Sequence, residues 1–214
     1  LTDVSYLDET GTSQTCDSAT EVTSSDTGWG TSGTTTWYVV QGTVIIGSRV
    51  TVSGDVHLIL TDGCTLTVNG GIQVQDDDDD ITNGSANALT IYAQKQPDLD
   101  EAGNVTNNVG KLIATGAKRD YNAVIGGNEG NDYGGSGGAV TINGGVVKAT
   151  NADGAGIGGG RDNFSSGSAG TFQTNNGNAV IFASSMRKRD KYVWAAIFNL
   201  TWYCIAALVL AAHD

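Results

Sequence analysis

Proline, histidine and basic residues are scarce in this chain of 214 residues, and each scarcity excludes a class of protein. The sequence holds 1 Pro and 2 His, and 11 Lys and Arg face 23 Asp and Glu, for a formal net charge of -12. An acidic chain of this kind disfavours nucleic acid as a partner and favours cations. Its 3 Cys are too few for a disulfide-built scaffold, and none lies in a C-x-x-C pattern. A Cys16–Cys64 bridge stays open for a secreted protein.

What the sequence has in abundance is glycine, at 31 residues, set among short runs of β-branched residues. From Trp37 onward these runs are WYVV, TVII, RVTV, VHLIL, TLTV and GIQV, and each is closed by turn-forming residues. They are too short for helices and too closely spaced for the favoured hairpins. Short strands joined by tight corners are typical of a parallel β-helix, in which each coil stacks on the one before it.

An internal repeat supports this interpretation. The segment that starts at Ala123 aligns without a gap with the segment that starts at Ala155, an offset of 32 residues, and Ile125 then matches Ile157. We therefore predict an all-β fold, a right-handed parallel β-helix (solenoid) with a C-terminal hydrophobic helix. The expected domains are an N-terminal lead-in or cap over residues 1–36, the parallel β-helix over 37–185, and a basic segment plus hydrophobic helix over 186–214.

The C-terminal stretch departs from the glycine-rich style. A basic cluster, Arg187 to Lys191, precedes the apolar run YVWAAIFNLTWYCIAALVLAA at 192–212, which is long enough to span a bilayer as a helix. The basic residues precede the run, an order that would place the β-rich part on the cytoplasmic side. A membrane contact through 192–212, a helix that caps the β-rich part, and a tail not native to the domain are the three interpretations.

The repeated motifs carry a resemblance to a known group. The stretch from WYVVQGTVIIGSRV to GGIQV, followed by LTIYAQ, AVIGGN, VTINGGVVKAT and GAGIGGG, resembles a repeat region of large surface proteins of gut bacteria, described as carbohydrate-binding or adhesin-like. The resemblance covers about residues 4–183. It implies a secreted or cell-surface module that binds a glycan or another host or cell-surface ligand, and it transfers no catalytic residue.

Catalytic signals are sparse. Parallel β-helix enzymes that cleave acidic polysaccharides use clustered Asp with Lys, Arg or His, whereas Asn151 and Asp153 are here interpreted as turn residues. His57 lies within VHLIL, on the face opposite Val56 and Leu58, and a packed or exposed strand histidine fits that position better than a catalytic one. We expect no catalytic residue, with a polysaccharide-cleaving enzyme and a structural stalk as alternatives.

Two acidic loops stand out. Asp76 to Asp80 form an unbroken run, which predicts either a solvated loop or a calcium site, because adjacent carboxylates repel one another unless they are solvated or bound to a cation. The candidate metal ligands are Asp76, Asp77, Asp78, Asp79 and Asp80. A second loop, 94–108, holds the only proline and is expected to protrude.

Aromatic residues beside amides and carboxylates are the pattern expected of glycan binding. Such residues occur in the two glycine-rich loops of the repeat, whereas Trp37 and Tyr38 are interpreted as cap or core. The predicted ligand-binding residues are Asn131, Asp132, Tyr133, Asp162, Asn163 and Phe164. Threonine-bearing strands also raise ice binding as a minor hypothesis. The sequence thus predicts an extracellular, non-catalytic module for binding or adhesion, with carbohydrate as the expected ligand and no cofactor other than calcium.

Overall fold

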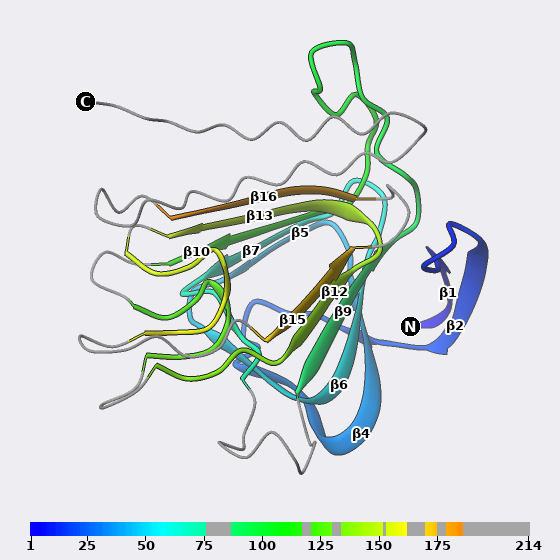
Figure 1. Cartoon of the computed structure of the whole chain (residues 1–214). Helices are drawn as coiled ribbons and strands as arrows, with labels where there is room; N and C mark the ends of the chain where they lie inside the picture. Colours follow the sequence, from blue (N-terminus) through cyan, green and yellow to red (C-terminus); the bar gives the residue numbers. More distant parts are fainter. Residues whose placement is uncertain are drawn as a thin grey trace.

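The protein is described by a computed structural model (Figure 1) that covers most of the chain. It describes residues 1–75, 87–116, 121–129, 134–151, 153–161, 170–174 and 179–185. The strands within these residues are β1 (Thr2–Leu7), β2 (Ser13–Ser18), β3 (Thr20–Glu21), β4 (Gly28–Val40), β5 (Thr43–Ile46), β6 (Val50–Leu60), β7 (Thr65–Asn69), β8 (Ile72–Gln73), β9 (Ala88–Ala93), β10 (Lys111–Thr115), β11 (Ile125–Gly126), β12 (Ala139–Ile142), β13 (Gly145–Asn151), β14 (Ile157–Gly158), β15 (Thr171–Thr174) and β16 (Ala179–Ser185).

These strands form three sheets. A 5-stranded sheet has the order β16-β13-β10-β7-β5, and its strands are all parallel. A 9-stranded sheet contains the path β14-β11-β8-β6-β9-β12-β15, with β4 paired to β6 and β3 paired to β4, and it too is parallel. The two parallel sheets curve around one interior (Figure 1), and β1 and β2 form a separate antiparallel hairpin.

Alternation along each strand builds the core. In β7, Leu66 and Val68 are fully buried, whereas Thr65 and Thr67 between them face outward and are half-buried. Residues that pair across strands fall on the same face, so the inner faces of both sheets become continuous rows of Val, Leu and Ile. This row-by-row burial of branched side chains is the main stabilising contribution that the sheets share.

The internal repeat is confirmed as strand register. Ile125 pairs with Ile157, and Ala139 pairs with Thr171, so both pairs keep the 32-residue offset of the sequence alignment.

The Arg49 side chain links segments that are far apart in the sequence. It donates from Nε to Oδ1 of Asn128 at 2.8 Å, from Nη1 to the Gly70 carbonyl at 2.8 Å and from Nη2 to the Ala123 carbonyl at 2.9 Å.

The predicted fold class, a right-handed parallel β-helix with a C-terminal hydrophobic helix, is corrected by this structure. The described residues contain no helix, and their strands belong to three sheets, one of them antiparallel and the others curved toward a nearly closed, barrel-like arrangement. The predicted hydrophobic helix at 192–212 lies outside the described residues.

The predicted fold was wrong because residues that commonly form turns lie inside a long strand here. Ser53, Gly54 and Asp55 were expected to close a strand, but they lie inside β6, which has 11 residues. Gly54 adopts a φ of 73° there, and its N–H donates to the side-chain oxygen of Asn87 at 2.7 Å. A glycine in this conformation lets the strand continue without the steric penalty that a Cβ would bring.

The N-terminal residues, expected to be a loose lead-in or cap, form regular structure. β1 and β2 pair from Thr2–Ser18 to Leu7–Ser13. β4 begins at Gly28 and runs to Val40, so it crosses the expected domain boundary between residues 36 and 37. In the hairpin turn, Asp8 accepts hydrogen bonds from the Thr10 hydroxyl at 2.6 Å, the Thr10 and Thr12 N–H groups at 2.9 Å each, and the Gln14 amide at 2.8 Å.

Replacing Gly126 by Ala should destabilise the fold by about 1–3 kcal/mol, because its φ of 136° is unfavourable for an L side chain and a Cβ would collide with the Gly158 carbonyl oxygen. Gly47→Ala is the matched control, since a Cβ there has open space around it and φ is not positive. Urea unfolding of both variants measures the difference. Equal midpoints for the two variants would contradict the close stacking of β11 on β14.

The Asp8 turn should show a pH dependence confined to strong acid. Hydrogen bonds, first from the Thr10 hydroxyl and then from Gln14, lower the pKa of Asp8 from 3.8 to about 2. Because the folded pKa is the lower one, the stabilisation of the turn is present above pH 3.8 and is lost as the pH falls through about 2. An NMR titration of the Asp8 carboxyl group checks this, and Asp8→Asn should remove the transition from the Thr10 and Thr12 amide signals.

Candidate functional site

The hairpin packs on the outer face of the 9-stranded sheet. Val4, Cys16 and Ala19 of the N-terminal segment bury themselves against Val39 of β4, Ile59 of β6 and Tyr92 of β9. These three sheet residues point away from the main core, so the hairpin gives the sheet a second, smaller apolar cluster on its outer side (Figure 1). One band of the outer face is therefore covered, and the band beside it is left open.

A continuous row of side chains occupies that open band. Trp37 pairs with His57, His57 with Thr90, Thr90 with Thr141, and Thr141 with Gln173, each on the next parallel strand. We call these five residues the tryptophan row. All five are half-buried or exposed. Since neighbouring strands lie about 4.8 Å apart, the row is about 19 Å long.

A hydrogen-bonded chain supports the tryptophan end of the row. His57 Nε2 lies 3.1 Å from Oδ2 of Asp55, and His57 Nδ1 lies 3.2 Å from the Tyr92 hydroxyl. The Thr35 hydroxyl donates to the same Asp55 oxygen at 3.0 Å. The Asp55 side chain is 43% exposed and that of His57 is 18% exposed, so the carboxylate faces solvent while the imidazole is mostly covered.

Tyr92 keeps its proton at neutral pH, because burial, followed by the nearby Tyr6, Glu9 and Asp55, raises its pKa to about 12. Its hydroxyl lies against Nδ1 of His57. The Asp55 carboxylate can only accept a hydrogen bond, so Nε2 of His57 is the donor of the bond between them. Both ring nitrogens of His57 are thereby occupied.

Four rings pack together at this place. Trp37 lies 4.4 Å from the His57 ring and 5.5 Å from Tyr92, between ring centroids, and Tyr6 of the hairpin lies 5.0 Å from Trp37 and 4.8 Å from Tyr92. Such ring pairs fix one another's orientation and contribute about 0.5–1.5 kcal/mol each beyond buried area. Trp37 is thus held as a rigid, partly exposed ring beside His57, whose Nε2 contacts the Asp55 carboxylate.

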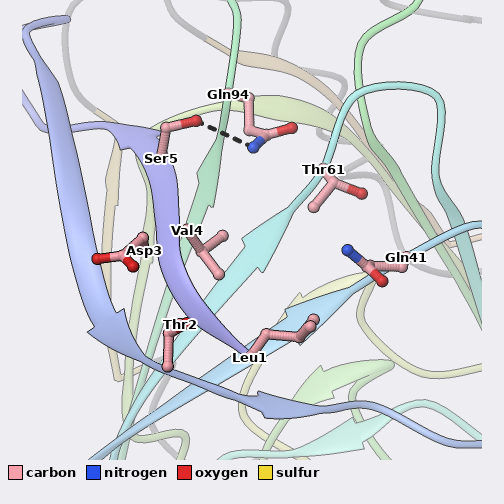
Figure 2. Close-up of a pocket in the computed structure, with 8 residues that line it drawn as sticks. All are labelled: Leu1, Thr2, Asp3, Val4, Ser5, Gln41, Thr61 and Gln94. Atoms are coloured by element: carbon pink, nitrogen blue, oxygen red, sulfur yellow. Dashed lines mark hydrogen bonds between the residues drawn. The ribbon is translucent and has the colours of Figure 1, made fainter.

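A pocket of about 260 Å³ lies between the N-terminal residues of β1 and the residues that follow β4, β6 and β9. Figure 2 shows β1 residues on one wall and Gln41, Thr61 and Gln94, which follow the ends of β4, β6 and β9, on the other. The Gln94 amide donates to the Ser5 hydroxyl at 3.1 Å (Figure 2), and this bond joins the two walls. The lining residues are Leu1, Thr2, Asp3, Val4, Ser5, Gln41, Thr61 and Gln94.

The predicted ligand-binding residues Asn131, Asp132, Tyr133, Asp162, Asn163 and Phe164 lie outside the described residues. The structure does describe the bases of their two loops, and it brings these bases together. The Gly160 N–H donates to the Gly135 carbonyl at 2.9 Å, and the Gly127 N–H donates to the Gly158 carbonyl at 2.9 Å. The two loops therefore begin and end at neighbouring positions.

The predicted metal ligands Asp76 to Asp80 also lie outside the described residues. In the part of the chain that the structure describes, no three His, Cys, Asp or Glu side chains come together as a metal site. Nor does that part contain a helix long and apolar enough to cross a bilayer.

The loop over residues 94–108 projects from the body of the molecule, as expected (Figure 1). Asp100 shapes it by accepting hydrogen bonds from the Asn104 N–H at 2.7 Å and the Ala102 N–H at 3.0 Å. At the base of the loop, Lys95 and Asp62 form an ion pair of 2.6 Å.

The disulfide between Cys16 and Cys64, which the sequence left open, does not form. Both thiols are free: Cys16 is buried under the hairpin and Cys64 is buried in the main core.

No protein-family model, curated protein or solved structure matches this chain in the comparisons. The site is therefore interpreted from its own geometry. The sequence prediction placed His57 correctly on the face opposite Val56 and Leu58. It missed the role of Trp37, which belongs to the outer apolar cluster and to the open row. The alternating pairs Thr35-x-Trp37 and Asp55-x-His57 were the available signal.

Tyr92→Phe tests the hydrogen-bonded chain. The free energy of unfolding should fall by about 0.5–1.5 kcal/mol, because His57 Nδ1 loses its hydrogen-bond partner. In the wild-type protein, the folded pKa of Tyr92 is the higher one, so stability should fall as the pH rises from 10.0 toward about 12. Alkaline spectrophotometric titration should show one fewer late-titrating tyrosine in the variant, and an unchanged curve would contradict the assignment.

Proposed function

We propose that this protein is a non-catalytic binding or adhesion module whose ligand is carbohydrate. The observation that carries the proposal is the band beside the hairpin, where a rigid tryptophan lies against a histidine that contacts a carboxylate, and in register with hydroxyl and amide side chains on successive strands. A sugar offers an apolar ring face and a rim of hydroxyl groups, which are donors and acceptors at once. The tryptophan row presents both complementary kinds of group.

The arrangement of the row also favours an extended ligand over a small one. Thr90, Thr141 and Gln173 lie on consecutive strands, so hydrogen-bonding groups recur about every 4.8 Å along the row. An oligosaccharide that crosses the strands would meet one such group at each step. The side chains stand on a sheet whose other face is packed, so they need little ordering on binding.

Binding fits the chemistry of the row better than cleavage does. Glycoside hydrolysis commonly needs two carboxyl groups within about 5–10 Å of each other. Asp55 is the only carboxylate at the outward positions of the described strands β4, β6, β9, β12 and β15. The other carboxylate whose charge acts on Tyr92, Glu9, belongs to the hairpin and not to the row. Both ring nitrogens of His57 contact protein groups, Asp55 and the Tyr92 hydroxyl, and its side chain is mostly covered.

The proposal keeps the setting that the resemblance implies, a secreted or cell-surface protein of the carbohydrate-binding or adhesin-like kind. A structural stalk is the competing function, because a regular stack of parallel strands also makes a rigid spacer. The tryptophan row favours binding, since a spacer has no need of a partly exposed tryptophan in register with a histidine that contacts a carboxylate.

A glycan array probed with the full chain tests the proposal. Trp37→Ala and Gln173→Ala should each weaken binding about threefold to tenfold, because one removes the ring and the other an exposed amide at the far end of the row. Gln173 is exposed, so its variant should keep the wild-type unfolding midpoint.

The matched control is Gln96→Ala, an exposed glutamine in the projecting loop and outside the row. It should bind glycans as the wild type does. No binding to any glycan, or equal losses in all three variants, would overturn the proposal and favour the stalk.

A further inference from the structure

The outer face of the 5-stranded sheet differs in charge from the rest of the molecule. In a chain with 23 acidic and 11 basic residues, none of its outward positions is an Asp or a Glu. Two of them are lysines. By register and alternation the outward positions are Thr43, Ile45, Thr65, Thr67, Asn69, Lys111, Ile113, Thr115, Val146, Lys148, Thr150, Val180, Phe182 and Ser184. All of them are half-buried or exposed except Val180, which is buried.

The two lysines are the cations that the described structure leaves unpaired. Lys95 pairs with Asp62, Arg49 is bound to backbone carbonyls and Asn128, and Arg161 lies over the Tyr121 ring. Lys111 and Lys148 are both exposed, and within the described residues neither ammonium group has an ion-pair or hydrogen-bond partner. This sheet face therefore carries local positive charge on an acidic protein.

The geometry brings these charges together. Lys111 pairs with Val146 and Ile113 pairs with Lys148, so the lysines lie one strand and two residues apart. With strands about 4.8 Å apart and about 3.3 Å per residue, their Cα atoms are about 8 Å apart. Flexible stems let both ammonium groups reach a single anionic ligand.

Apolar side chains lie beside the lysines on the same outer face of the 5-stranded sheet. Ile45, Thr67, Ile113, Lys148 and Phe182 form one row in register across all five strands. Ile45 is 56% exposed and Phe182 is 40% exposed, which places two of the large exposed apolar residues of the described structure in this single row. Threonines flank the row on both sides.

The size of the face indicates the kind of partner. Five strands, with two outward positions on β5 and three on each of the others, span about 19 by about 13 Å, or roughly 250 Å². A stable protein interface needs about 800 Å² per partner, so this face is too small to hold a folded protein by itself. A narrow, extended polymer that bears negative charges, hydroxyl groups and apolar ring faces fits its lysines, threonines and apolar row.

We propose that the outer face of the 5-stranded sheet is a second binding surface, specific for an anionic polysaccharide with carboxylate groups. Lys111 and Lys148 bind carboxylates of the chain, while Phe182 and Ile113 contact its sugar rings. The inference rests on the proposed function for its ligand class, but it uses a different sheet from the tryptophan row.

The test compares full-length variants in their binding to polygalacturonate, to its methyl ester and to poly-glutamate. The double variant Lys111→Gln/Lys148→Gln should bind polygalacturonate about threefold to thirtyfold more weakly than the wild type, with a shallower dependence on salt. The methyl ester, which lacks the charges, should bind the wild type as weakly as polygalacturonate binds the variant.

Lys95→Gln is the matched control for the single variants Lys111→Gln and Lys148→Gln, because it too removes one positive charge, from an exposed lysine that already has a partner. Equal effects of Lys95→Gln and of the two single variants would show a net-charge effect and overturn the inference, as would tighter binding of poly-glutamate than of polygalacturonate. Loss of glycan binding in Trp37→Ala with no change in the double variant would overturn this inference and leave the proposed function intact.

Discussion

Register between parallel strands is the constraint on which the rest of this structure depends. Each strand bonds to the one before it through backbone groups, so a side chain on one strand must lie beside its partner on the next. On the inner faces this requires rows of compact apolar residues, such as Leu66, Leu112 and Val147. Between β11 and β14 it requires backbone so close that a Cβ on Gly126 would collide with the Gly158 carbonyl oxygen. One slip of a residue would move every row to the wrong face.

The hairpin uses the same constraint on the outer face. Val39, Ile59 and Tyr92 share a row because their strands share a register, and the hairpin covers that row alone. Tyr6 then fixes Trp37 and Tyr92, and Tyr92 fixes His57. The position of the exposed tryptophan thus follows from packing that begins with the first strand of the described chain.

The sequence predicted the local features well and the long-range ones poorly. The strand at 43–46, the 32-residue repeat and the outward face of His57 are confirmed, because each depends on alternation or on self-similarity within a short stretch. The tryptophan row could not be predicted, since its partners lie 33 residues apart (57 to 90) and then 51 residues apart (90 to 141). Because the segments between these strands differ in length, the pairing of the strands does not follow a fixed period in the sequence. The prediction that a strand ends at Ser53–Asp55 was wrong, because the positive φ of Gly54 is accessible to glycine both in a turn and inside an irregular strand.

The outer faces of the two parallel sheets carry different residues, because core packing constrains only the inward positions. Inward positions are constrained by packing, but outward positions contribute little to stability and can therefore differ from sheet to sheet. One outer face carries Asp55 in contact with His57, and the other carries Lys111 and Lys148 with no carboxylate at its outward positions. A spacer would gain nothing from the two lysines, because exposed charges without a partner add no stability. Separation of charge between two open faces does change which ligands each face attracts. The distribution of outward residues therefore argues for two distinct binding surfaces on one rigid scaffold.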